Sequence, residues 1–98
     1  MAAEPAPDAA PAVSVTLPPG LVALFPGAPM STRAAAADIA SLLDALDARW
    51  PGMRDRLADT RPAIRRHIQL FVDGRRATLE TPLHPGADVV FLTAVSGG

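Results

Sequence analysis

The chain has 98 residues, of which 49% are apolar and 19% are charged, so its length and composition are those of one small globular domain. Its net charge of −1 argues against a nucleic-acid partner, and no apolar segment is long enough to predict a membrane span. The chain contains no cysteine, which excludes disulfides, thiolate metal sites and thiol catalysis by its own residues.

The first twelve residues, MAAEPAPDAAPA, are almost all alanine and proline with two acidic residues. Such a segment buries little apolar surface, so we expect residues 1–12 to form a disordered extension. The segment has neither the basic start nor the apolar stretch of a secretory signal, and we therefore expect a cytoplasmic protein. The folded domain is expected to span residues 13–94, followed by a flexible tail at residues 95–98.

The first strand is predicted at Val13–Leu17, where apolar residues alternate with small or polar ones. After it, residues 21–25 are expected to form a turn-rich connection that places Leu21, Leu24 and Phe25 on the core. The alanine-rich residues 29–36 are harder to interpret, because alanine favours helix. We expect an edge strand there, since a helix cap at Asp38 requires the residues before it to be non-helical.

The helix after Asp38 is marked by apolar residues at helical spacing and ends at the sequence Pro51-Gly52. The residues on its apolar face are Ile39, Leu42, Leu43, Leu46 and Trp50. Trp50 and Phe25 are expected to anchor the core. A short turn that contains Met53 and Leu57 is expected to follow.

Three strands are predicted in the second half of the chain. The alternation in Ile68–Val72 predicts the first, and Asp73-Gly74 is typical of a hairpin turn. A short return strand is expected at Thr78 and Leu79. The last strand, Val89–Thr93, has apolar residues on both faces, which predicts a central position in the sheet. One helix between two hairpins predicts an α+β fold of two layers.

The sequence VSGG at residues 95–98 follows this last strand. Glycine has no side chain and loses much conformational freedom when it is ordered, so Gly97 and Gly98 are a poor end for a packed fold. The same two residues make a thread that fits a narrow channel. The four residues from Val95 extend about 13 Å at ~3.3 Å each.

Four segments in this order resemble the MoaD/ThiS family of ubiquitin-like sulfur carriers. They are LLDALDARWPG at residues 42–52, RRHIQLFVDG at 65–74, LHPGADVVF at 83–91 and the terminal VSGG. The resemblance covers residues 13–98 and implies a β-grasp fold, in which a mixed sheet of four to five strands packs on one main helix. Both a MoaD-like carrier and a CysO-like carrier fit these motifs.

The resemblance also implies a function. Gly98 would be adenylated by an ATP-using, E1-like enzyme of the MoeB/ThiF type and converted to a thiocarboxylate. Gly97 would give access to it, while Val95 and Ser96 would guide the tail. The sulfur would pass to an acceptor, which is a synthase subunit or an enzyme of molybdopterin, thiamin, cysteine or secondary-metabolite synthesis. The chain itself would be no enzyme and would bind no metal or cofactor, because ATP is used by the partner.

Surface residues supply candidates for these contacts. Phe71 is expected on the sheet face opposite Ile68 and is an interface candidate, because exposed aromatic residues often mark protein contacts. Arg65 and Arg66 belong to a basic run that is either a solvated face or a docking patch for an acidic partner. His67 and His84 are expected to be ordinary surface residues, with no acidic cluster beside them.

Two other function classes stay open. One is a protein modifier conjugated to targets through Gly98; all nine basic residues are arginine, so lysine-linked chains of this protein are excluded. The other is a non-catalytic interaction module, because a fold does not determine a function. The module would tolerate the loss of Gly98, whereas the carrier and the modifier would not.

Overall fold

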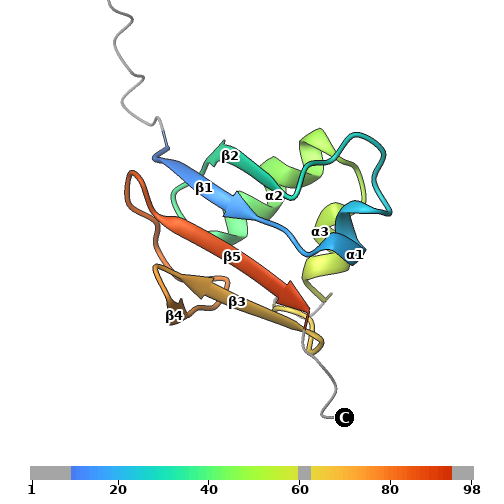
Figure 1. Ribbon diagram of the computed structural model, residues 1–98. Helices are drawn as coiled ribbons and strands as arrows, with labels where there is room; N and C mark the ends of the chain where they lie inside the picture. The colour runs from blue at the N-terminus through green and yellow to red at the C-terminus, as the bar shows by residue number, and fades with distance from the viewer. Residues whose placement is uncertain (1–9, 60–62, 94–98) are drawn as a thin grey trace, which may run out of the picture.

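The computed structural model describes residues 10–59 and 63–93, which form one five-stranded sheet with helices on one of its faces (Figure 1). The strands are β1 (Ala12–Thr16), β2 (Ser31–Ala35), β3 (Ile68–Val72), β4 (Arg75–Arg76) and β5 (Asp88–Thr93). The helices are α1 (Pro19–Val22), α2 (Ile39–Arg49) and α3 (Met53–Leu57). This two-layer α+β architecture is the one predicted from the sequence.

The strand order is β2-β1-β5-β3-β4, so β5 lies in the centre as predicted. It pairs in parallel with β1 and antiparallel with β3. The expected edge strand is also confirmed, because β2 continues to Ala35 and, among the described strands, pairs only with β1. Arg49 covers part of this edge by donating to the Arg33 carbonyl at 2.8 Å and to Thr32 Oγ1 at 3.0 Å.

Helix α2 begins where Asp38 was expected to cap it. The Ser41 amide donates to Asp38 Oδ1 at 2.8 Å, and the Asp38 amide donates to Ser41 Oγ at 3.2 Å, which completes a capping box. The helix ends before Gly52, whose φ of 97° lies in the left-handed region that favours glycine. The turn expected after it is a short helix, α3, which buries both Met53 and Leu57.

The hairpin after β3 differs from the prediction. Asp73 and Gly74 have φ angles of 52° and 82°, as a two-residue type I′ turn requires. Such a tight turn places Arg75 directly opposite Val72, so the return strand β4 comes before Thr78 and Leu79. Leu79 is buried instead in the following loop, where its carbonyl accepts the Ala40 amide of α2 at 3.0 Å.

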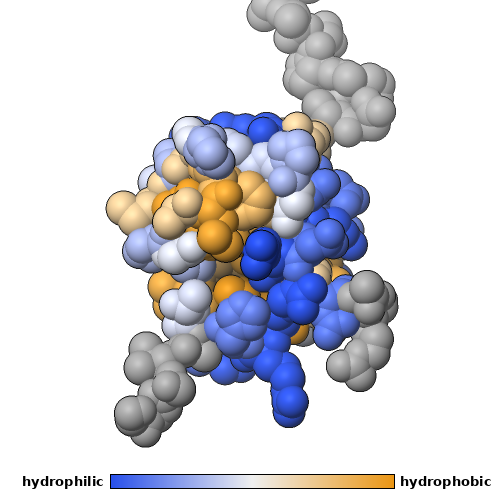
Figure 2. Space-filling model, turned by 90° about the vertical axis from the view of Figure 1, so that its right-hand side faces the viewer, coloured by the Kyte–Doolittle hydropathy of each residue, from blue (hydrophilic) through white to orange (hydrophobic). Residues whose placement is uncertain are grey.

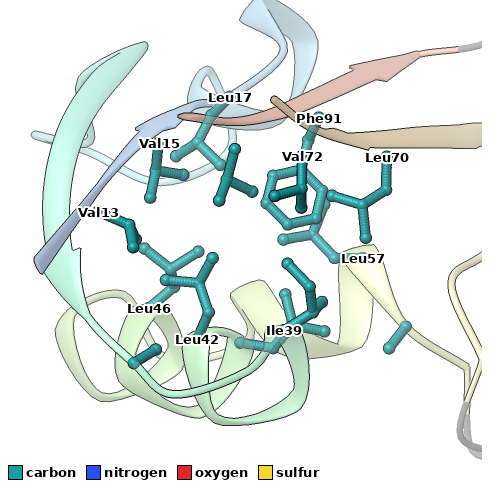
Figure 3. Close-up of a cluster of buried hydrophobic side chains, with 14 of the residues drawn as sticks. Val13, Val15, Leu17, Ile39, Leu42, Leu46, Leu57, Leu70, Val72 and Phe91 are labelled. Carbon is teal, nitrogen blue, oxygen red and sulfur yellow. The ribbon is translucent and has the colours of Figure 1, made fainter. Parts of the chain in front are cut away.

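The core lies between the sheet and helices α2 and α3 (Figure 3). Phe91 from the central strand is fully buried, as are Leu42 and Leu46 from the helix that faces it. The connection after β1 contributes less than expected. It contains the short helix α1, which buries Leu21, while Leu24 is 53% exposed. Phe25 and Trp50 pack on the core from its rim and are only partly buried.

No helix within residues 10–59 and 63–93 is long and apolar enough to cross a membrane.

Replacing the cap of α2 tests why the chain changes from strand to helix at residue 38. Asp38→Ala removes the acceptor of the Ser41 amide and should lower the free energy of unfolding by about 1 kcal/mol. Asp38→Asn is the matched control, because asparagine caps helices about as well. Urea denaturation of the three proteins at neutral pH measures the difference. Equal losses in both variants would contradict the capping role.

Candidate functional site

The central strand β5 leads to the predicted tail. Its last residue, Thr93, pairs with Ile68 of β3. On its other side the pairing with β1 already ends at Val90, opposite Thr16. Among the described strands, the end of β5 therefore extends beyond β1 and pairs with β3 alone. Val95, Ser96, Gly97 and Gly98 lie outside the described residues, so their predicted roles stay predictions.

Three apolar side chains gather on the sheet face that the helices leave uncovered. Register places Phe71 opposite Val90 and Gln69 opposite Leu92. Phe71 and Val90 are half-buried, and Leu92 is 43% exposed. We call Phe71, Val90 and Leu92 the open-face patch. The expected position of Phe71 on the face opposite Ile68 is confirmed, while its role as a contact residue remains a prediction.

Polar groups border the open-face patch. The Arg76 guanidinium lies over the Phe71 ring, 5.8 Å from its centroid, within the range of a cation–π contact. Thr16 neighbours Val90 on the side of β1. An apolar centre with a polar rim is the usual anatomy of a protein interface. Sequence reasoning missed Val90 and Leu92 as surface residues, because it assigned both faces of β5 to the interior.

The two arginines expected at an interface flank the same end of the sheet. They precede Ile68, whose partner Thr93 ends β5. Arg65 is half-buried, and its Nε donates to the backbone carbonyl of Asp55 in α3. Arg66 is exposed. Another nearby arginine, Arg54 of α3, turns instead toward α2 and pairs with Asp44 at 3.1 Å.

His84 has an acidic neighbour that the sequence did not predict. Its Nε2 lies 2.6 Å from Asp73 Oδ2, and its Nδ1 lies 2.9 Å from the Pro85 carbonyl oxygen. The other oxygen of Asp73 accepts the Asp88 amide at 2.9 Å. Asp73 thus joins the turn after β3 to the turn before β5. His67 is exposed, as expected.

The contacts of this pair shift both pKa values. The Asp88 amide and then the His84 side chain lower the pKa of Asp73 below its ordinary value of 3.8. Asp73 and then the Pro85 carbonyl raise the pKa of His84 above its ordinary value of 6.5. Both ring nitrogens face acceptors, so the imidazolium form satisfies both contacts. Among the described residues, no group of three His, Cys, Asp or Glu side chains is placed to hold a metal ion.

Comparison with known proteins identifies the family. The model of the ThiS family matches residues 24–98, which is more than half of the chain. The chain belongs to the ThiS family. No curated protein sequence is similar enough to this chain to count as a match.

Solved structures agree with this family. A chain of the BexX/CysO complex from Amycolatopsis orientalis is 26% identical, with a TM-score of 0.76 over 88% of this chain and 99% of that one. CysO of Mycobacterium tuberculosis is 25% identical, with a TM-score of 0.77 over 85% and 99%. SAMP1 of Haloferax volcanii is 24% identical, with a TM-score of 0.71 over 89% and 99%, and shows the shared fold. These matches confirm the predicted β-grasp fold.

The Asp73–His84 pair predicts how stability depends on pH. The raised pKa of His84 stabilises the fold fully below pH 6.5, and this contribution is lost as pH rises through the folded-state value. The lowered pKa of Asp73 stabilises the fold above pH 3.8, and this contribution is lost as pH falls through its folded-state value. The pair therefore stabilises the fold most between pH 3.8 and pH 6.5.

Urea midpoints measured from pH 4 to pH 9 check this prediction. In the unchanged chain the urea midpoint should begin to fall above pH 6.5, the ordinary pKa of His84. This fall should disappear in His84→Gln, which keeps a polar side chain that does not titrate. His67→Gln is the matched control, because it removes an exposed histidine at the start of β3 and should retain the decrease. The same loss of pH dependence in both variants would contradict a role specific to His84.

Proposed function

We propose that this chain is a sulfur carrier whose C-terminal Gly98 becomes a thiocarboxylate. The observation that carries the proposal is the ThiS-family match through residue 98. The matched residues include Gly97-Gly98, which follow the end of the central strand β5 at Thr93 after three intervening residues. The similarity to CysO at 25–26% identity also supports a carrier. The chain is a substrate of partner enzymes and binds no cofactor of its own, so the catalytic side chains belong to those partners.

The proposed chemistry proceeds in two steps on a partner enzyme. A Gly98 carboxylate oxygen attacks the α-phosphorus of ATP, and pyrophosphate leaves, which yields an acyl-adenylate. A sulfur nucleophile, in the simplest case hydrosulfide, then attacks the carbonyl carbon. The carbon–oxygen bond to AMP breaks, the sulfur loses its proton, and a thiocarboxylate remains. The chain needs no thiol for either step, which agrees with its lack of cysteine.

The glycines suit this chemistry because an adenylating enzyme has to enclose the reacting carbonyl. A side chain at residue 97 or 98 would widen the thread where the partner's backbone approaches closely. In the proposal Gly97 gives access, Val95 and Ser96 guide the tail, and the ATP-using partner is an E1-like enzyme of the MoeB/ThiF type. The sulfur then passes to an acceptor enzyme or synthase subunit of cofactor, cysteine or secondary-metabolite synthesis.

Intact-protein mass spectrometry tests the carrier proposal. We expect the chain, purified from its native cell, to contain a species in which sulfur replaces one C-terminal oxygen. Deleting Gly98 should abolish that species, while deleting residues 2–9 should leave it unchanged. If only the carboxylate is found after incubation with ATP, a sulfur donor and the native activating enzyme, the carrier proposal is wrong.

The same samples separate the carrier from the modifier. Conjugation through Gly98 would give larger adducts that resist denaturing electrophoresis, and these would also disappear when Gly98 is deleted. A chain that retains its partner interactions without Gly98 would instead be an interaction module.

We further propose that the open-face patch contacts the activating enzyme. Its residues are apolar, half-buried or exposed, and lie on β3 and on β5, the strand that leads to the tail. The neighbouring Arg76 gives the polar border of an interface. Leu92 is the residue of the patch with the largest exposed fraction, 43%, so changing it disturbs the core least. Phe71 is covered in part by Arg76 and would be a less specific probe.

Leu92→Asp should weaken binding to the activating enzyme by about tenfold or more, which is at least ~1.4 kcal/mol, because it places a charge in an apolar contact. Met30→Asp is the control, since Met30 is also an exposed apolar residue but precedes the edge strand β2. Titration calorimetry gives the affinities, and thermal unfolding checks that both variants are folded. Equal affinities of Leu92→Asp and the unchanged chain would rule out contact through the patch.

A further inference from the structure

A groove lies beside the end of β5, separate from the open-face patch. It has a volume of about 720 Å³ and lies among α1, α3 and the start of β3. The lining residues that matter for its chemistry are Leu21, Leu24, Arg56, Arg65, His67 and Thr93. Thr93 is the last described residue of β5, so the groove borders the point at which the predicted tail begins.

One side of the groove is apolar. Leu21 of α1 and Ile68 of β3 are buried and form its floor. Leu24 is 53% exposed at the rim, although the sequence predicted that it would reach the core. Figure 2 shows apolar surface beside hydrophilic surface on the side of the molecule that carries α1 and α3. An exposed leucine next to an apolar floor is suited to receive an apolar side chain.

The other side of the groove is cationic. Among the described residues that line it, two arginines and one aspartate together carry one net positive charge at neutral pH. Arg65 is held at its position by the bond from its Nε to the Asp55 carbonyl. Arg56 is exposed and forms no ion pair within residues 10–59 and 63–93. His67 lies on the same side of the groove.

We propose that this groove binds an acidic segment of a protein partner, in which an apolar side chain is flanked by carboxylates. The apolar side chain packs against Leu24 and the floor, and the carboxylates pair with Arg56 and Arg65. Arginine suits this role because its planar guanidinium can bind a carboxylate through two parallel hydrogen bonds. The inference concerns binding alone, so it stands or falls independently of whether Gly98 carries sulfur.

Nuclear magnetic resonance on the full-length, ¹⁵N-labelled chain tests the groove directly. The probe is a capped peptide of sequence Glu-Leu-Glu-Glu-Leu, and the control peptide has lysine in place of each glutamate. We expect the acidic peptide to shift the backbone amides of Leu24, Arg56 and Thr93, and added salt to weaken its binding. The amides of Phe71 and Val90 in the open-face patch should stay in place.

Paired variants determine whether charge and apolar contact both contribute. Arg56→Glu should weaken binding of the acidic peptide by about tenfold, whereas Arg75→Glu, the same change at an exposed position in β4, should alter it less than about twofold. Leu24→Ser should weaken binding by about fivefold, whereas Met30→Ser, at a residue of equal exposure, should have little effect. Each spectrum also shows whether the variant is folded.

Several results would overturn the proposal. They are the absence of shifts at millimolar acidic peptide, equal binding of the lysine peptide, and shifts confined to the open-face patch. A fourth is binding of the acidic peptide only to a chain from which residues 94–98 have been deleted. That result would mean that the chain's own tail occupies the groove. The proposal is supported if the amides of Leu24, Arg56 and Thr93 shift and if Arg56→Glu and Leu24→Ser weaken binding more than their control variants do.

Discussion

The rest of the structure depends on the burial of one face of the sheet by a single long helix. Helix α2 places Ile39, Leu42 and Leu46 against the inward side chains of β1, β3 and β5 (Figure 3). Phe91 lies in the centre of this contact and is fully buried. One helix can cover only one face of a sheet of this size. The opposite face therefore remains uncovered, even where its side chains are apolar.

This constraint explains the unusual sequence of β5. A central strand in a sheet that is covered on both faces is apolar throughout, whereas a strand with one solvated face alternates. Strand β5 is apolar on both faces, yet only Val89 and Phe91 are buried. Val90 and Leu92 gain nothing from the core and lie where a partner can cover them. Under the proposed function, contact with the activating enzyme accounts for their apolar character.

The sequence was sufficient to predict the elements whose signals are local. The cap at Asp38 indicated the start of α2 and excluded helix for the alanines before it, because a residue cannot cap a helix that already contains its preceding neighbours. The return strand was misplaced because its position follows from the turn and not from its own composition. Arg75 and Arg76 show no apolar alternation that would indicate a strand, and they pair with β3 because the two-residue turn places them opposite Val72 and Phe71.

The candidate site was less predictable, because its contacts join residues far apart in the chain. Phe71 was found from the alternation of its own strand. The partner of His84 could not be found in this way, since Asp73 lies in a separate turn and meets it only when β3 and β5 pair. The exposure of Val90 and Leu92 could have been predicted from the sequence, because the one predicted helix cannot cover both faces of the sheet. The groove at Thr93 is lined by residues of α1, α3 and β3, which are far apart in the chain, and no pattern in the sequence predicts that they meet.

The two candidate surfaces differ in chemistry and meet at the same strand. The open-face patch is apolar with an arginine at its border, and the groove combines an apolar floor with two arginines. Under the proposed function, a carrier has to be accepted first by an activating enzyme and then by a sulfur acceptor, and both enzymes need the tail. A partner that used only the tail could not distinguish this chain from another carrier ending in Gly-Gly. Contacts on both sides of β5 supply that distinction, because affinity from surfaces next to the tail adds to the binding of the tail itself.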